Sequence, residues 1–198
     1  PPVAVACDVA VAGGSAASLA AALTAAEAAP SLSVCFLELT DWPGGQLTAG
    51  GVPAIDFGPK GTNMVAANQP ASFASMMAAV PGNPGACSVS VKCYEAKKLV
   101  DDWITPRLAK ASNLRVFLRS AVVGAARNAS AYGGAVTSLT AVQRRPTGAV
   151  PEYTRPLSQA LPDWYSPAAS DYFAKRTLAV TAKVFVEATE LGDVLATA

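Results

Sequence analysis

The chain has 198 residues, of which 52% are hydrophobic and 15% charged, and its formal net charge is +1. This length is ample for one hydrophobic core, and the composition is typical of a buried α/β sheet and excludes a disordered chain. The charge balance offers no electrostatic case for binding nucleic acid. No apolar run reaches the roughly 20 residues that cross a bilayer, so no membrane span is expected.

The sequence contains no histidine. Within these residues, a Ser-His-Asp or Cys-His nucleophilic site is therefore excluded, and so is metal ligation by histidine. No metal site is expected. The basic pairs Lys97–Lys98 and Arg144–Arg145 are interpreted as solvated surface charges.

An apolar strand, a glycine turn and an alanine-rich helix open the chain. The strand is expected over 8–12, and Gly13 and Gly14 supply a tight turn after it. A helix is expected over 16–29, where Pro30 ends it. In a dinucleotide-binding unit such a turn places pyrophosphate on the helix N-terminus, where unpaired N–H groups favour negative charge.

An acid stands near the end of the next apolar strand, expected over 33–39. Glu38 lies twenty-five residues after Gly13, near the spacing at which a carboxylate accepts hydrogen bonds from a ribose. The glycine pattern GxGxxG is incomplete, because Ser15 and Ser18 stand at its second and third glycine positions. Ser15 can offer its backbone N–H and its hydroxyl to a phosphate, and Ser18 has only a small side chain where the helix approaches the sheet. The turn and the acid do not by themselves separate NAD from FAD.

Three stretches of the chain are distinctive: VAVAGGSAASLAAALTAA from Val9, FLELTDWPGGQLTAGG from Phe36 and VFVEATELGDVLATA from Val184. They resemble VVVxGGTPAGIAAAIAAA, LLEPTDWLGGQLTAGG and VFIDATGDGDLAA of FAD-dependent oxidoreductases with a glutathione-reductase-like FAD-binding fold. The nearest group is related to heterodisulfide reductase and xanthan-lyase-associated flavoproteins. The resemblance covers nearly the whole chain, and the GGQLTAGG loop favours FAD over NAD.

The resemblance also implies where FAD binds. The loop after the acid strand would run along the flavin, and the last motif would lie near the ribityl chain and pyrophosphate. The start of a β-meander would meet the adenine. The cofactor-binding candidates are Gly13, Gly14, Ser15, Ala16, Glu38, Leu39, Gly44, Gly45, Gln46, Leu47, Thr48, Val122, Thr189, Gly192 and Asp193. Glu190 and Leu191 depart from the family, which often has Gly and Asp there. No catalytic residue is identified.

The fold class implied is α/β: one Rossmann-like FAD-binding domain over 1–198, with a parallel sheet, helices and a β-meander. The proline-rich stretch 145–172 is interpreted as an excursion from the meander, either functional or a surface insertion. The other elements expected are a loop over 43–59, helices over 71–80 and 94–111, a third parallel strand over 113–118, meander strands over 121–127 and 135–144, and strands over 177–181 and 183–188.

The function implied is that of the FAD-binding part of an oxidoreductase that transfers a hydride from an unidentified small-molecule substrate to flavin. The alternative is a cofactor-free structural or interaction module derived from a flavoprotein. The family continues into a C-terminal substrate domain, which is absent from this chain. We therefore expect a second polypeptide carrying the rest of the flavoprotein, most simply from the same precursor.

The four cysteines divide into two pairs. Cys7 and Cys35 fall on neighbouring predicted strands and are interpreted as small core residues. Cys87 and Cys93 lie in a turn-rich loop and are expected to form a disulfide; the alternatives are two free thiols or a redox-active pair. Together with a sequon at Asn128 and a start without methionine, this pair suggests a secreted glycoprotein.

Overall fold

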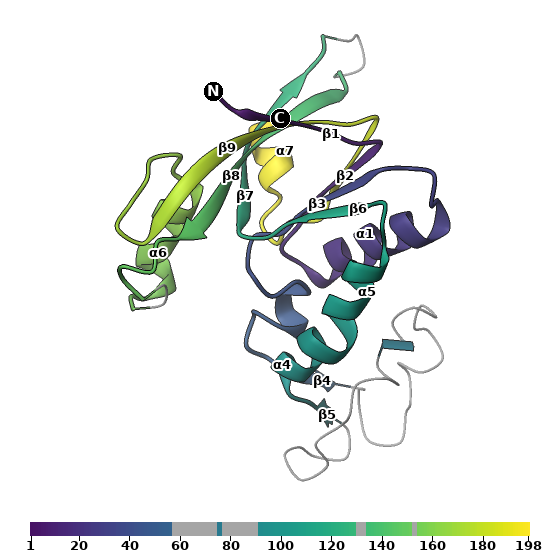
Figure 1. The fold of residues 1–198 in the computed structure, drawn as a ribbon, viewed down its shortest axis with the longest axis vertical. Helices are drawn as coiled ribbons and strands as arrows, with labels where there is room; N and C mark the ends of the chain where they lie inside the picture. The colour runs from purple at the N-terminus through teal and green to yellow at the C-terminus, as the bar shows by residue number, and fades with distance from the viewer. Residues whose placement is uncertain (57–74, 77–90, 130–133, 152–153) are drawn as a thin grey trace.

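The computed structural model describes residues 1–56, 75–76, 91–129, 134–151 and 154–198. Two four-stranded sheets lie against each other, and helix α1 (Ala16–Ala28) packs on the outer face of the first one (Figure 1). The described part of the chain therefore has three layers: helix, parallel sheet and a second sheet.

The first sheet is parallel throughout and has the strand order β10-β2-β3-β6. Its strands are β2 (Val9–Ala12), β3 (Val34–Leu37), β6 (Leu114–Phe117) and β10 (Val184–Glu187). Because parallel neighbours need a crossover, helix α1 connects β2 to β3. The Rossmann-like strand–helix–strand unit predicted at the start of the chain is confirmed.

The second sheet has the order β1-β9-β8-β7. Its strands are β1 (Val3–Ala6), β7 (Ser120–Arg127), β8 (Val136–Pro146) and β9 (Phe173–Thr181). The last three pair antiparallel and form the predicted meander, whereas β1 pairs parallel with β9. The sequence does not predict β1 as a separate strand. Only two residues separate β1 from β2, and the two strands read as one apolar run.

The chain passes from the second sheet to the first at Cys7 and Asp8. The Cys7 amide donates to the Thr181 carbonyl at 3.0 Å, and the Asp8 amide donates to the Ser33 carbonyl at 2.9 Å. The Asp8 carboxylate pairs with Lys183 at 2.7 Å and accepts two hydrogen bonds from Ser33. Lys183 and Ser33 hold the pKa of this carboxyl well below its ordinary value. The crossing is thus tied to both sheets.

The helix predicted over 94–111 is confirmed as three consecutive pieces. These are α4 (Ala96–Lys98), the π-helical turn η2 (Leu99–Ile104) and α5 (Thr105–Lys110). Of the helix predicted over 71–80, only residues 75–76 lie in the described part. None of the helices within the described ranges is long and apolar enough to cross a bilayer.

The prediction of an unbroken loop over 43–59 is wrong. The segment contains the 3₁₀ helix η1 (Gly45–Leu47) and the strand β4 (Ala54–Asp56), which pairs with β5 (Val91–Cys93). Among the described residues β4 and β5 form a two-stranded sheet, which lies apart from the two large sheets (Figure 1). The remaining helices are α6 (Leu157–Tyr165) and α7 (Asp193–Thr197).

The central strands β2 and β3 are buried on both faces, which explains their continuous apolar runs. Residues packed between the first sheet and the helices include Val11, Leu19, Leu23, Phe36, Leu99 and Ile104. Residues packed between the two sheets include Ala10, Ala12, Cys35, Leu37, Leu139, Leu178 and Val180. Successive side chains of a strand alternate between the two layers, so both cores depend on the same two strands.

Cys7 and Cys35 are joined by a disulfide, with their Cα atoms 6.0 Å apart. Cys35 is buried in the core between the sheets and Cys7 packs against it, as interpreted, but the bond between them was not predicted. Cys7 lies where the chain crosses from the second sheet to the first, and Cys35 belongs to the core between the two sheets, so the crossing brings the two residues together. The guanidinium of Arg115 adds a contact, with Nη2 3.1 Å from the sulfur of Cys35.

The disulfide predicted between Cys87 and Cys93 falls partly outside the described residues. Cys93 is disulfide-bonded, whereas Cys87 is not among the described residues, and their pairing stays a prediction. Secretion also stays a prediction. Asn128 of the sequon is exposed, and its Oδ1 accepts from the Ala135 amide at 2.7 Å.

Replacing both Cys7 and Cys35 with Ala should lower the free energy of unfolding by about 3–4 kcal/mol, because the bond closes a loop in the unfolded chain. The sequence separation of the pair is 28 residues. Urea denaturation without reductant measures the difference, and reduction of the wild type should bring its curve toward that of the variant. A non-reducing peptide map in which the two cysteines are unlinked would contradict the assignment.

Candidate functional site

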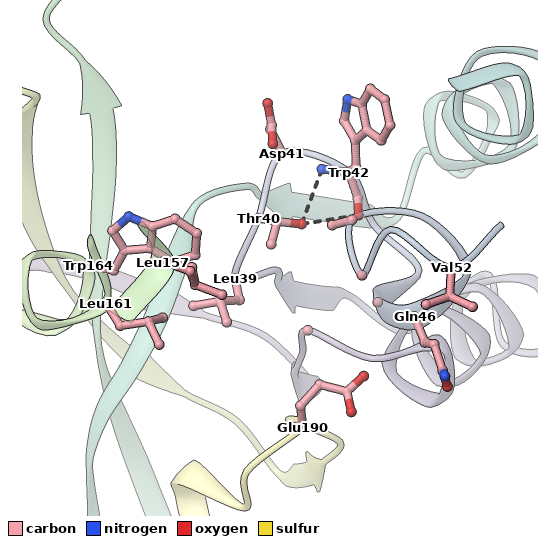
Figure 2. Close-up of a pocket in the computed structure, with 14 residues that line it drawn as sticks. Leu39, Thr40, Asp41, Trp42, Gln46, Val52, Leu157, Leu161, Trp164 and Glu190 are labelled. Carbon is pink, nitrogen blue, oxygen red and sulfur yellow. Dashed lines mark hydrogen bonds between the residues drawn. The ribbon is translucent and has the colours of Figure 1, made fainter. Parts of the chain in front are cut away.

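A cavity of about 890 Å³ opens where β2 and β3 end (Figure 2). Four of the sequence-predicted residues line it, and they come from different segments: Gly14, Leu39, Gly45 and Gln46. The glycine turn, the end of the acid strand and the glycine loop therefore meet at one place. Ligands of open α/β sheets bind at this edge, outside the carboxyl ends of the strands.

The turn after β2 depends on the missing side chains of Gly13 and Gly14. A Cβ at Gly13 would lie 2.5 Å from the Phe36 ring and 2.7 Å from the Leu37 carbonyl oxygen, so no larger residue fits. Gly14 has a φ of +137°, a backbone conformation that residues with a side chain rarely adopt. The turn can therefore lie directly against β3.

Ser15 and Ser18 replace the missing glycines with a capping box. The Ser15 hydroxyl accepts from the Ser18 amide at 3.1 Å and donates to the Ala188 carbonyl at 2.6 Å. The Ser18 hydroxyl accepts from the amides of Gly14 and Ser15, both at 3.2 Å. These contacts begin helix α1 in the way expected of an N-cap serine. The first turn of α1 carries no acidic residue, so its positive dipole end faces no carboxylate of its own.

The glycine loop after β3 lies on this turn. A Cβ at Gly45 would be 2.6 Å from both the Gly14 oxygen and the Ser15 Cα, and Gly44 and Gly45 both have positive φ, at +119° and +54°. The buried Thr48 closes the loop by donating to the carbonyls of Trp42 and Pro43. Gly14 and Gly45, which meet at this contact, both line the cavity.

Leu47, Ala16 and Val122 do not line the cavity. The Leu47 carbonyl accepts from the Tyr94 hydroxyl at 2.7 Å, and its side chain lines a separate cavity of about 330 Å³ together with Ala16 and Trp103. Val122 of β7 pairs with Ala141 of β8 and is buried between the sheets. A role for Val122 would have to come from its backbone.

Glu38 is fully buried directly beneath the cavity wall. Its Oε1 accepts from the amide and the hydroxyl of Thr40, at 3.0 and 3.1 Å. Its Oε2 is buried without a hydrogen-bond partner among the described residues. Burial raises the pKa of this carboxyl from 4.5 to about 7, although the Thr40 bonds oppose the shift. A carboxyl with one oxygen unsatisfied is an acceptor available to a ligand.

The last motif folds around an acid that the sequence reasoning missed. Glu187 accepts from the amide and hydroxyl of Thr189 through Oε1, and from the Val194 amide through Oε2 at 2.6 Å. The Thr189 hydroxyl accepts from the Asp193 amide, and Gly192 enables the turn with a φ of +72°. The sequence does contain a signal for Glu187: it ends an apolar strand, just as Glu38 follows one.

The far wall of the cavity comes from α6, which the sequence places in the proline-rich excursion. Leu157, Leu161 and Trp164 line the cavity from this helix. Sequence reasoning did not select them, because no motif marks a segment whose contacts are made only in the folded chain. The α6 hydroxyl of Tyr165 donates to Oδ2 of Asp193 at 2.9 Å. The excursion thus contacts the last motif.

Arg144 is 3% exposed, so its interpretation as half of a solvated arginine pair is wrong. Neighbouring residues of a strand point to opposite faces, and only Arg145 faces solvent. The Arg144 guanidinium lies 4.3 Å from the centre of the Trp164 ring, and its Nη2 donates to the Leu39 carbonyl at 2.8 Å. This residue therefore connects α6 with the end of the acid strand.

Comparison with protein families matches residues 8–150 to the family described as FAD dependent oxidoreductase. The match covers more than half of the chain and includes the turn, the acid strand, the glycine loop and most of the meander. A search of curated proteins found no match.

The fold is similar to several solved structures. THI4 of Thermovibrio ammonificans has 17% identity and a TM-score of 0.55, and the alignment covers 97% of this chain and 61% of that chain. Adenylylsulfate reductase of Archaeoglobus fulgidus has 12% identity and a TM-score of 0.53, with 94% and 30% covered. Quinol fumarate reductase FrdA of E. coli has 12% identity and a TM-score of 0.52, with 93% and 32% covered.

These low identities show a common fold, and the chain spans less than two thirds of the length of each of the three structures. The family match and the cavity at the carboxyl ends of β2 and β3 agree on what kind of domain this is. The chain belongs to the FAD-dependent oxidoreductase family, and it is an FAD-binding, Rossmann-type part of such a protein.

Proposed function

We propose that this chain binds FAD in the cavity between β2, β3 and α6, and that the flavin accepts a hydride from a small-molecule substrate. The observation that carries the proposal is the meeting of the glycine turn, the acid strand and the glycine loop around one cavity of about 890 Å³. The family match supports the cofactor.

Glu38 fits the ribose of FAD. A ribose hydroxyl that donates to Oε2 would supply the hydrogen bond that this oxygen lacks, and would favour the ionised carboxyl. Leu39 and Thr40 line the cavity whereas Glu38 lies beneath it. The Glu38 side chain therefore has to turn toward the cavity when the ribose binds.

The two glycine segments fit the pyrophosphate. Gly14 leaves the cavity free of a side chain beside the positive end of α1, and the amides that follow it belong to the first turn of that helix. The Ser15 hydroxyl is engaged with Ala188 and Ser18, and the amides of Gly14, Ser15 and Ser18 donate to serine hydroxyls. We therefore assign the attraction for the phosphates to the positive end of the α1 dipole rather than to the Ser15 hydroxyl.

Bound FAD supplies a two-electron acceptor through its isoalloxazine ring. The chain itself binds and orients the cofactor. Glu38 and α1 hold the ribose and pyrophosphate, while the loop from Gly45 to Val52 lies at the opposite end of the cavity from α6 (Figure 2). We assign this loop to the flavin end.

Glu190 lines the same cavity as the loop from Gly45 to Val52. Its Oε1 would lie 2.8 Å from a Cβ at Gly45, and the residue is exposed. A carboxylate here repels the phosphates of FAD. This departure from the family motif therefore weakens binding in our proposal.

We also propose that a second polypeptide, or chain beyond these residues, covers the flavin end. Val52 lines that end and is 49% exposed, and hydride transfer needs a substrate held against the ring with water excluded. Light scattering on native, active material should give a mass above the 20.0 kDa of this chain. A particle of this chain alone that holds FAD and turns over would contradict this expectation.

The substitution Glu38→Gln should affect stability and FAD affinity in opposite directions. The folded pKa of about 7 lies above the ordinary value of 4.5, so the stability that this group contributes is complete below pH 4.5 and is lost as the pH rises through 7. The stability lost on ionisation is about 3 kcal/mol. Gln does not ionise, so the variant avoids this loss. FAD affinity should fall about tenfold, because the ribose loses a charged acceptor.

Urea denaturation at pH 4 and pH 8 measures the stability change of Glu38→Gln, and a flavin-fluorescence titration of the full chain measures affinity. At pH 8 the variant should be the more stable protein, whereas at pH 4 the two should be similar. Unchanged FAD affinity would remove Glu38 from the ribose site. A wild type that binds no FAD would overturn the proposed function.

The substitution Glu190→Gln should tighten FAD binding by about fivefold at low ionic strength, because it removes a charge that repels the pyrophosphate. The gain should shrink in 0.5 M salt, since salt screens exposed charges. Asp102→Asn, an exposed acid outside the cavity, is the control and should change nothing. Equal affinity of Glu190→Gln and wild type at low salt would show that the carboxylate lies away from the phosphates.

A further inference from the structure

Helix α6 places an apolar surface at one end of the cavity. Figure 2 shows Leu157 and Leu161 of this helix close to Leu39, at the opposite end of the cavity from Gln46 and Val52. No charged side chain of α6 lines the cavity. This end therefore suits an apolar, uncharged part of a ligand.

The order of groups in FAD decides which part that is. In FAD the adenosine ribose lies between the adenine and the pyrophosphate. In the chain Leu39 directly follows Glu38 at the end of β3, whereas the pyrophosphate position at Gly14 follows the neighbouring strand β2, and α6 lies beyond Leu39. With the ribose at Glu38, the adenine extends past Leu39 and reaches α6.

The apolar residues of α6 are only partly covered by the protein itself. Trp164 and Ala160 are buried in a cluster with Phe173, against which Leu39 and Leu161 pack. Leu157, by contrast, is 58% exposed although it lines the cavity. A planar heterocycle placed between Leu39 and the two α6 leucines would cover this exposed apolar surface.

Three sets of contacts hold α6 in place. Trp164 stacks on the buried guanidinium of Arg144, which itself donates to the Leu39 carbonyl. Asp163 pairs with the buried side chain of Lys175 and accepts from the Ser170 hydroxyl at 3.0 Å. With the Tyr165 bond to Asp193, these contacts make α6 a fixed wall before any ligand binds.

We propose that α6 is the adenine-binding wall of the FAD site, with Leu157 and Leu161 packed against the ring opposite Leu39. The excursion is then a binding element of the domain and not a surface insertion. The inference rests on the proposed function, because it takes FAD as the ligand of this cavity.

Two probes and three matched variants test the proposal on the full chain. ADP carries the adenosine and pyrophosphate of FAD but no flavin, so calorimetric titration with FAD and with ADP separates the two ends of the cavity. The exposed residues Leu157, Val52 and Leu32 are each replaced with Gln, which adds no charge that could act on the phosphates. Leu32 is outside the cavity lining and serves as the control.

Leu157→Gln should weaken the binding of FAD and of ADP by the same factor, about five- to tenfold. Val52→Gln should weaken FAD binding and leave ADP binding unchanged, whereas Leu32→Gln should alter neither. Because all three side chains are exposed, each variant should unfold at the same urea midpoint as the wild type, and denaturation curves check this.

Unchanged ADP affinity in Leu157→Gln would overturn the α6 assignment, and so would an equal loss of ADP affinity in Val52→Gln. Either result leaves the proposed function intact as long as the wild type binds FAD. A wild type that binds neither FAD nor ADP overturns both the function and the adenine wall.

Discussion

The close contact between two glycine segments is the constraint on which the site depends. A Cβ on Gly45 would lie only 2.6 Å from the Gly14 oxygen and from the Ser15 Cα, so the backbone leaves no room for it. Gly13 meets the same limit against Phe36 of β3. Since the turn lies on β3 and the loop lies on the turn, the segments that line the cavity are placed by packing against one another. Backbone contacts, which cannot adjust as side chains do, therefore set the shape of this part of the cavity.

Arg144 plays a comparable part on the other side of the cavity. A buried guanidinium is unfavourable unless it is well bonded, and this one lies under the Trp164 ring and donates to the Leu39 carbonyl. It joins β8 of the second sheet to the end of β3 in the first. The proline-rich excursion is thereby packed onto the body of the domain, and α6 takes its place in the cavity wall.

Local pattern was enough to predict much of the fold and part of the site. The order of strand, glycine turn, helix and acid strand in the first 38 residues needs only periodicity and turn chemistry, and the structure confirms it. Gly14, Leu39, Gly45 and Gln46 do line one cavity. Their contacts are made between segments close in sequence.

Features that depend on distant partners could not be predicted in this way. Strand β1 exists because it pairs with β9, more than 170 residues away, and Arg144 is buried because α6 folds over it. The disulfide between Cys7 and Cys35 depends on the crossing of the chain between the two sheets at Cys7, which neither segment shows alone. Helix α6 was not predicted because its segment is rich in proline, which is typical of a loop. In the structure Pro156 directly precedes the helix and Pro162 lies inside it.

The strand order β10-β2-β3-β6 also has a consequence for the chain as it is synthesised. β2 leaves the ribosome long before its neighbour β10 (Val184–Glu187), because more than 170 residues separate the two strands. Until then one edge of β2 has unpaired amides and carbonyls, which are a template for wrong pairing. Pairing across such a sequence separation is intrinsically slow. Both residues of the Cys7–Cys35 bond are synthesised before β10, so the bond can hold β2 beside β3 until β10 is available.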